Sequence, residues 1–214
     1  MTPTEVKICG LTRPEDVALA CELGARWLGF NFAAESPRRV GLNRARELAL
    51  ASLASPGTGR VGVFVRESLD EIRSAVAAAS LDAVQVHRPL RAQDVEEIPR
   101  PVFAVVHVAG APLDVPAAGS LERCRAVFFD SAAGSADGGT GRAFDWSLLE
   151  GRRWPVPFFL AGGLTPENVG AAVARLRPAG VDVASGVESA PGIKDRERMV
   201  RFFEAVKEAD ENKE

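Results

Sequence analysis

The chain has 214 residues, 46% of them hydrophobic, which is enough for one sizeable core. Its formal net charge of −3 argues against a nucleic-acid or anionic-membrane partner, and neither a signal peptide nor an apolar run of bilayer length is expected. The three cysteines are odd in number and lack CxxC spacing, so we expect reduced thiols and a cytoplasmic protein.

Short β-rich runs alternate with helical runs along the whole chain. The expected strands cover residues 6–9, 27–32, 60–65, 83–86, 102–108, 126–130, 158–161 and 180–184. The expected helices cover residues 14–24, 43–53, 68–79, 93–98, a turn around 120, a short helix near 146, then 166–176 and 195–208. A polar loop at 33–41 and a glycine-rich loop at 131–142 interrupt this alternation.

Three of the expected helices have cap signals in the sequence. Thr12 with Glu15, and Ser68 with Glu71, have the spacing of capping boxes. The third signal is Thr165, which precedes a proline at the first helical position.

The alternation predicts an α/β fold with a parallel sheet and right-handed crossovers. The runs 60–65, 102–108 and 126–130 are apolar apart from Arg60, His107 and Asp130, as is typical of parallel strands covered on both faces. Eight β–α units favour a single (β/α)8 barrel, or TIM barrel, with outer helices over an open sheet. We therefore expect one catalytic domain at 1–208 and a charged tail at 209–214.

Polar and small residues follow the expected strands, where a barrel of this kind places its active site. The two glycine turns after residues 161 and 184 would let backbone N–H groups approach a phosphate, although glycines also serve merely to permit tight turns. The residues at these strand ends are Cys9, Asn31, Gln85, His87, His107, Asp130, Gly162, Gly163, Ser185 and Gly186.

Cys9 is the first candidate for chemistry. A lone cysteine is more often a small buried hydrophobe, and Cys21 and Cys124 fit that description. Cys9 differs because it ends a strand and precedes Gly10. To act as a base near neutral pH it must ionise more easily than a free thiol of pKa about 8.5, which a helix N-terminus or a bound cationic intermediate would promote.

Asp130 ends an apolar strand, where a carboxyl group is either a loop cap or a functional acid. As a general acid it needs a raised pKa, which partial burial would supply. A thiol with a lowered pKa and a carboxyl with a raised one would form an acid/base pair.

Three further polar residues each have two possible interpretations, and a fourth, Asp182, raises a question of burial. Arg38, in the loop after the second strand, suits carboxylate recognition but also fits a solvated basic turn. His87 and His107 are either ligands or core residues; they are far apart and form no metal-binding motif, so no metal site is expected. Asp182, inside the eighth strand, needs a partner if it faces the barrel.

An ordered set of motifs runs through essentially the whole chain and resembles the phosphoribosylanthranilate isomerases of tryptophan biosynthesis. The motifs are KICGLT at 7–12, GF at 29–30 with SPR at 36–38, VGVFV at 61–65, VQVH at 84–87, FDS at 129–131, GGTG at 138–141 with FDW at 144–146, AGGLTPENV at 161–169, and VDVASGVE at 181–188 with PGIKD at 191–195. Two departures are Arg88, where the family usually has glycine, and Ala161, where it often has serine.

The resemblance implies an aldose–ketose isomerase that performs a cofactor-free Amadori rearrangement, the third step from chorismate. Cys9 would be the base that removes the proton from ribose C2, and Asp130 the acid that opens the furanose ring. Arg38 would bind the anthranilate carboxylate, and Asp182 would lie near the substrate nitrogen. The implied substrate-binding set is Arg38, Gln85, His87, Gly139, Gly162, Gly163, Asp182, Ser185 and Gly186. No metal is implied, the partner is a small phosphoribosyl compound, and the chain would be a monomer or a homodimer.

Three competing functions share the barrel. An imidazole-branch isomerase would be expected to show a half-barrel repeat, and we see none in the sequence. A phosphopentose epimerase would need metal-binding histidines and acids at strand ends, and there are only two histidines. A non-catalytic phosphate binder would keep the glycine turns without needing Cys9 and Asp130.

Overall fold

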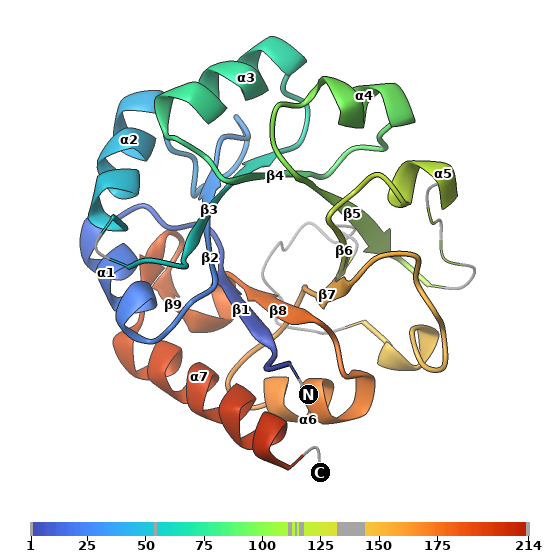
Figure 1. Ribbon diagram of the computed structural model, residues 1–214. Helices are drawn as coiled ribbons and strands as arrows, with labels where there is room; N and C mark the ends of the chain where they lie inside the picture. Colours follow the sequence, from blue (N-terminus) through green and yellow to red (C-terminus); the bar gives the residue numbers. More distant parts are fainter. Residues whose placement is uncertain are drawn as a thin grey trace.

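Eight parallel strands close into a barrel (Figure 1). The computed structural model describes residues 2–53, 55–110, 113, 115, 118–131 and 144–212. Each strand pairs with the next in sequence, and the eighth pairs with the first, which confirms the predicted fold class. The strands are β1 (Glu5–Ile8), β2 (Trp27–Asn31), β3 (Gly59–Phe64), β4 (Ala83–Val86), β5 (Val102–Val108), β6 (Ala126–Ser131), β7 (Phe158–Leu160) and β8 (Gly180–Val183).

The helices form a ring outside the barrel (Figure 1). They are α1 (Pro14–Glu22), α2 (Leu42–Ala51), α3 (Leu69–Ala78), α4 (Ala92–Glu97), α5 (Ala118–Leu121), α6 (Val169–Leu176) and α7 (Arg196–Glu211). Between β6 and β7, the described part of the chain holds a single 3₁₀ turn, η1 (Trp146–Leu148). The last helix runs to Glu211, beyond the expected end at residue 208, so the first three residues of the expected charged tail belong to α7.

Alternate residues of each strand face the barrel axis, and they form two layers. Near the amino ends of the strands, aromatic rings fill the interior: Phe128 lies 5.3 Å from Phe103 and 4.6 Å from Phe159 between ring centres. Above Phe128, at 5.7 Å from its ring centre, lies the ammonium group of Lys7. The aromatic layer fills the barrel near the amino ends of the strands. The space for polar side chains therefore lies at the carboxyl ends.

The helix starts were predicted with mixed success. The capping box of Ser68 and Glu71 is present at α3, as predicted. At α1 the capping box is absent, because the Thr12 hydroxyl donates instead to Gly192 O at 2.5 Å. The helix expected from residue 166 begins at Val169, because the preceding residues form a turn closed by backbone bonds to Thr165 O.

A small antiparallel hairpin follows β8, and the sequence did not predict it. After the 3₁₀ turn η2 (Ser185–Val187), strand β9 (Glu188–Ala190) pairs with β10 (Ile193–Lys194). This hairpin places two charged side chains beside the end of β1. None of the helices in the described ranges is long and apolar enough to cross a bilayer.

Candidate active site

One pocket of about 230 Å³ lies at the carboxyl ends of the strands. Cys9 follows β1 and Asp130 lies in β6; β7 and β8 separate these strands on one side of the barrel. The described residues that line it are Cys9, Asn31, Val63, Gln85, His87, Asp130, Ser131, Ala161, Gly162, Gly163, Leu164, Asp182, Val183, Ala184, Ser185 and Gly186. The structure thus gathers all the predicted site residues except Arg38, which lies at the rim, and Gly139, which falls outside the described residues.

A buried ion pair forms the floor of the pocket. Lys7 Nζ donates to both carboxylate oxygens of Asp182, at 2.9 and 3.0 Å, and the lysine side chain is fully buried. Burial lowers the pKa of Lys7, but the charges of Asp182 and Cys9 outweigh it and leave the pKa above its ordinary value. Asp182 therefore has the partner that its position required. Our sequence reasoning assigned Lys7 no role, although a lysine inside a buried strand was itself a signal.

Cys9 is held by its backbone at the end of β1. Its N–H donates to Val183 O at 2.8 Å, and its carbonyl accepts from Lys194 Nζ at 2.6 Å. The expectation of a lowered thiol pKa is wrong for the ligand-free protein. Burial, reinforced by the negative charge of Asp182, raises the pKa of Cys9, and the nearby lysines only partly offset this.

Asp130 has the shift expected of a general acid. Burial, together with the charge of Asp182, raises its pKa to about 6, while His107 and Lys7 oppose the shift. In the ladder between β5 and β6, Asp130 lies opposite His107.

Two glycines let the turns after β7 and β8 approach their neighbours closely. Gly162 has φ of +78°, and a Cβ atom there would lie 2.3 Å from Ser131 N and 2.6 Å from Asp130 Oδ1. A Cβ atom at Gly186 would lie 1.9 Å from Leu164 O. All three distances are shorter than real contacts of a Cβ atom, so both positions require glycine. The two turns pack against each other and against the acid.

A Gly162→Ala substitution should therefore displace Asp130, and if Asp130 is the general acid that its position suggests, a displacement of roughly 1 Å should lower kcat by about 100-fold. Gly24→Ala is the matched control: its φ is +90°, but no atom lies within 4 Å of the added Cβ. Both variants carry backbone strain, so both should melt at lower temperature. Steady-state kinetics should separate them, and equal turnover in the two would contradict the role of the contact with Asp130.

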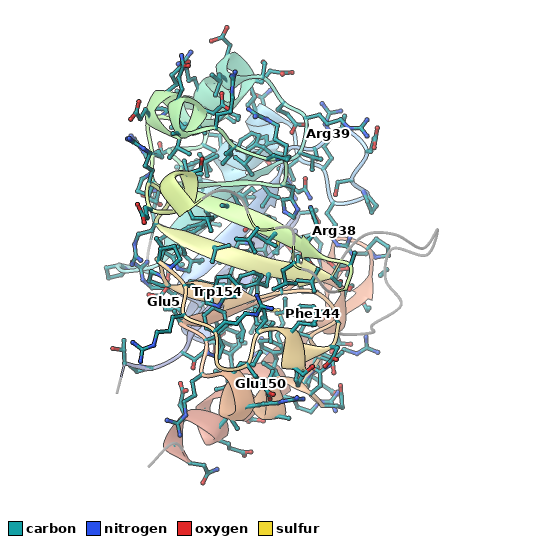
Figure 2. The ribbon with its side chains drawn as sticks, turned by 90° about the vertical axis from the view of Figure 1, so that its right-hand side faces the viewer. Glu5, Arg38, Arg39, Phe144, Glu150 and Trp154 are labelled. Carbon is teal, nitrogen blue, oxygen red and sulfur yellow. The ribbon has the colours of Figure 1, made fainter. Side chains whose placement is uncertain are left out.

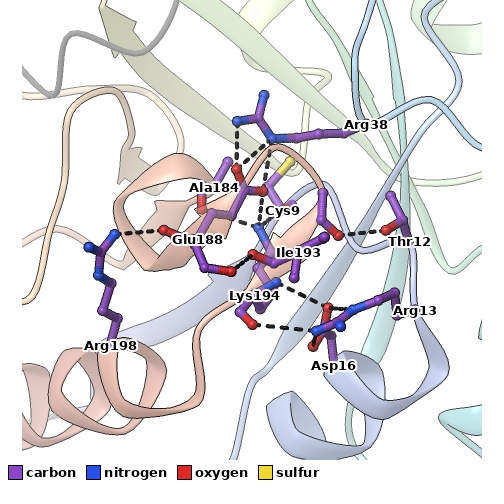
Figure 3. A network of polar contacts seen from close by, with 12 residues as sticks. Cys9, Thr12, Arg13, Asp16, Arg38, Ala184, Glu188, Ile193, Lys194 and Arg198 are labelled. Carbon is purple, nitrogen blue, oxygen red and sulfur yellow. Dashed lines mark hydrogen bonds and ion pairs between the residues drawn. The ribbon is translucent and has the colours of Figure 1, made fainter.

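At the rim, a charged cluster joins the loop after β2 to the β9–β10 hairpin (Figure 3). Arg38 donates to the carboxylate of Glu188 from Nε at 2.9 Å and from Nη2 at 2.7 Å. Lys194 Nζ donates to the same carboxylate at 2.8 Å and to Ala184 O at 3.1 Å. Burial disfavours the ionised Glu188, but its two cationic partners hold its pKa below the ordinary value.

This cluster carries one net positive charge beside Cys9, and it leaves part of Arg38 available. Among the described residues, none accepts a hydrogen bond from Arg38 Nη1. Figure 2 shows Arg38 at the end of the barrel opposite to Glu5, which begins β1. The guanidinium group is thus held at the mouth of the pocket with one edge facing away from Glu188. Sequence reasoning missed the roles of Glu188 and Lys194, since their contacts depend on the unpredicted hairpin.

The two histidines lie next to each other at the edge of the pocket, which His87 lines. Their ring centres are 5.4 Å apart, and His107 Nε2 lies 3.3 Å from His87 O. Burial, with the charges of His107 and Lys7, lowers the pKa of His87 to about 3. His107 is exposed, so the core-residue reading is wrong for it. One ring nitrogen of each histidine and one oxygen of Asp130 all lie within 4.8 Å of one another, so these residues could hold a metal ion.

A parallel (β/α)8 barrel with acid, thiol and glycine turns around one pocket at the carboxyl ends of its strands defines a TIM-barrel enzyme for a small substrate. Residues 6–205 match the family model described as N-(5'phosphoribosyl)anthranilate (PRA) isomerase. The chain belongs to this family of aldose–ketose isomerases.

Individual relatives agree with the family assignment. The chain is 41% identical to the N-(5'-phosphoribosyl)anthranilate isomerase of Pseudomonas aeruginosa (strain LESB58), over 97% of each chain. It is similar to the crystal structure of the isomerase from Thermotoga maritima, with 34% identity, a TM-score of 0.83, and coverage of 96% of this chain and 99% of that one. A third relative was solved in complex with reduced 1-(o-carboxyphenylamino)-1-deoxyribulose 5-phosphate; it has 33% identity, a TM-score of 0.80 and the same coverage.

Of the two departures from the family pattern, Arg88 is not among the described residues that line the pocket, whereas Ala161 is. Arg88 Nη1 lies 3.7 Å from Asp94 Oδ2, at the start of α4. Ala161 is buried and lines the pocket without a hydroxyl group.

Proposed function

We propose that this chain converts N-(5'-phosphoribosyl)anthranilate into 1-(2-carboxyphenylamino)-1-deoxyribulose 5-phosphate, a step of tryptophan biosynthesis. The observation that carries the proposal is the shared pocket: Cys9 and Asp130, from well-separated strands, both line it. A sugar bound between them would meet a proton donor and a proton acceptor from different sides.

In the first step, Asp130 acts as general acid. Its carboxyl proton passes to the furanose ring oxygen, the C1–O bond breaks, and the nitrogen lone pair forms a C1=N double bond. The open-chain intermediate is a protonated Schiff base with a cationic nitrogen. The burial that raises the pKa of Asp130 favours the protonated form that this step requires.

In the second step, Cys9 acts as general base. In its thiolate form it takes the proton from C2, the C–H electron pair forms a C1=C2 double bond, and the nitrogen becomes neutral. The resulting enol-amine tautomerises to the ketone. Lys7 and Lys194 favour the thiolate of Cys9 by their positive charges. The cationic nitrogen of the intermediate, one bond beyond C1, favours it further, so the intermediate activates the base that acts on it.

The charged ends of the substrate find matching groups at the pocket. The turns at Gly162–Gly163 and Ser185–Gly186 are placed to offer backbone N–H groups to the phosphate, and we expect Gly139 to contribute as well. We expect Arg38 to bind the anthranilate carboxylate, Asp182 to lie near the substrate nitrogen, and Gln85 and His87 to contact the sugar. The protons move between the substrate and this chain's own side chains, and the substrate neither gains nor loses electrons overall, so we propose no cofactor.

Removing the carboxylate that orients Arg38 should weaken substrate binding more than turnover. In Glu188→Gln, Arg38 loses its bidentate partner, and we expect KM to rise about 10- to 100-fold, since a charged hydrogen bond contributes about 1.5–3 kcal/mol. Because the substrate carboxylate is bound equally before and during the reaction, kcat should change much less. Arg38→Lys, which keeps the charge but loses the planar fork, should show the same split.

The matched control for this prediction is Glu167→Gln, which breaks the exposed contact between Glu167 and Arg201. It should leave both kinetic constants near the wild-type values. Melting temperatures of the three variants show whether loss of Lys194's partner also destabilises the fold. An unchanged KM in both Glu188→Gln and Arg38→Lys would remove Arg38 from substrate recognition.

The proposed function is tested by adding freshly made phosphoribosylanthranilate to the purified protein and following the loss of its fluorescence. We expect rapid loss that depends on enzyme concentration, with the deoxyribulose product identified by mass and chromatography. A protein that binds the phosphate ester but does not consume it would be the non-catalytic binder, and the proposal would fail.

The location and assembly of the chain belong to the same proposal. The three free thiols, Cys9, Cys21 and Cys124, fit a reducing cytoplasm. The chain is expected to be a monomer or a homodimer, which light scattering distinguishes.

A further inference from the structure

Three neighbouring strands bring potential metal ligands close together, and two of these residues, His87 and Asp130, line the pocket. His107 in β5 lies opposite Asp130 in β6, and His87 directly follows β4. One ligand atom from each residue lies within 4.8 Å of the other two. We propose that His87, His107 and Asp130 form a binding site for a divalent transition metal such as Zn²⁺ or Co²⁺, and that the bound ion inhibits the enzyme.

The donor set fits this class of ion. Two imidazole nitrogens and one carboxylate oxygen suit Zn²⁺ and Co²⁺, whereas Mg²⁺ and Ca²⁺ prefer oxygen ligands. Zinc binds such atoms at about 2.0–2.2 Å, so the three ligand atoms must approach one another to roughly 3.5 Å. The ligands stand at the ends of adjacent strands of one sheet, so the proposal requires side-chain rotation and no change of strand pairing.

Gln85 gives a second, independent indication. Its amide nitrogen lies 3.0 Å from His87 Nε2, while its amide oxygen is buried and has no hydrogen-bond partner among the described residues. Exchanging the amide oxygen and nitrogen would let the oxygen accept from His87 Nε2–H. The exchange gives the oxygen a partner, moves the unpaired position to the amide nitrogen, and leaves the other ring nitrogen of His87 to bind a cation while its partner accepts from Nε2–H.

The site is accessible and close to the proposed chemistry. His107 is exposed, which gives an ion a route from solvent, while His87 and Asp130 line the substrate pocket. An ion bound to the Asp130 carboxylate would occupy the position of the acidic proton and part of the space for the sugar. The inhibition rests on the proposed function, since it requires Asp130 to be the acid, whereas the binding itself does not.

Calorimetric titration of the purified chain with ZnCl₂, after removal of chelators, tests the site directly. Wild type should bind one ion, and His107→Ala should bind at least ten-fold more weakly. Cys9→Ser is the control for zinc capture by the pocket thiol, and it should keep wild-type affinity. Titration with Co²⁺ should add visible absorption bands without the near-ultraviolet band of a cobalt–thiolate bond. Unchanged binding in His107→Ala, or loss of binding in Cys9→Ser, would overturn the proposal.

Turnover measured in the same metal titration tests the inhibition separately from the binding of the ion. We expect Zn²⁺ to inhibit wild type at the concentrations that fill the site, EDTA to restore activity, and His107→Ala to resist inhibition. Metal that binds through His107 and leaves turnover unchanged at saturation would contradict the proposed inhibition. It would also contradict the acid role of Asp130. The metal site itself would still be supported by the binding data. Inhibition of equal potency in wild type and His107→Ala would contradict the site.

Discussion

Asp130→Asn is expected to lower kcat by about 10²- to 10⁴-fold, the usual contribution of a positioned general acid. The amide has nearly the same shape as the carboxyl group but cannot transfer a proton to the ring oxygen. The pocket should therefore keep its form, and the variant should bind a reduced product analogue with near wild-type affinity. Turnover and analogue affinity, measured on the same preparation, test the two halves of this expectation.

Asp82→Asn provides the control for this substitution. Asp82 immediately precedes β4 at the opposite end of the barrel, where it pairs with Arg60 at 2.8 Å and is partly exposed. Its amide variant should turn over substrate within about two-fold of wild type, in keeping with the small energetic effect of exposed ion pairs. If Asp130→Asn retained wild-type turnover as well, another group would have to open the ring.

Cys9→Ala is expected to show a comparable fall in kcat, about 10²- to 10⁴-fold, because no proton acceptor would remain beside C2. Substrate affinity should change little, since Arg38 and the glycine turns still bind the charged ends. Steady-state kinetics and a thermal melt of the variant separate a lost base from a damaged fold.

Two other cysteines allow a matched comparison with Cys9. Cys21 lies in α1 and Cys124 is buried outside the pocket, so Cys21→Ala and Cys124→Ala should keep normal kcat. The Cys124 variant should lose some stability because it leaves a small cavity. A near-normal kcat in Cys9→Ala would mean that another group removes the C2 proton.

The barrel could be predicted from the sequence because the signals for its strands are local. Runs such as 102–108 are apolar except for His107, and the structure has β5 at the same residues. Strand-end residues, including Cys9 and Asp130, follow from these boundaries and from the polarity of parallel strands. For the same reason the meeting of His87 and His107 was predictable in principle, since the strands that carry them are neighbours in the barrel.

The remaining features depend on contacts between residues distant in sequence. The Thr12 hydroxyl serves Gly192, 180 residues away, rather than capping α1. The hairpin that carries Glu188 and Lys194 has short strands with weak local signals, so the partner of Arg38 could not be predicted. The pKa of Cys9 depends on the balance between burial and the charges of Lys7 and Asp182, which only the folded arrangement determines.

The measurement that tests the central claim most directly is a crystal structure of this chain with reduced 1-(o-carboxyphenylamino)-1-deoxyribulose 5-phosphate. We predict that the C2 carbon lies beside Cys9 Sγ, and the sugar oxygen derived from the ring beside the Asp130 carboxylate on the other side of the sugar. The phosphate should rest on the turns after β7 and β8, and the aromatic carboxylate beside Arg38. A ligand bound elsewhere, or one that contacts neither the thiol nor the carboxyl group, would contradict the account.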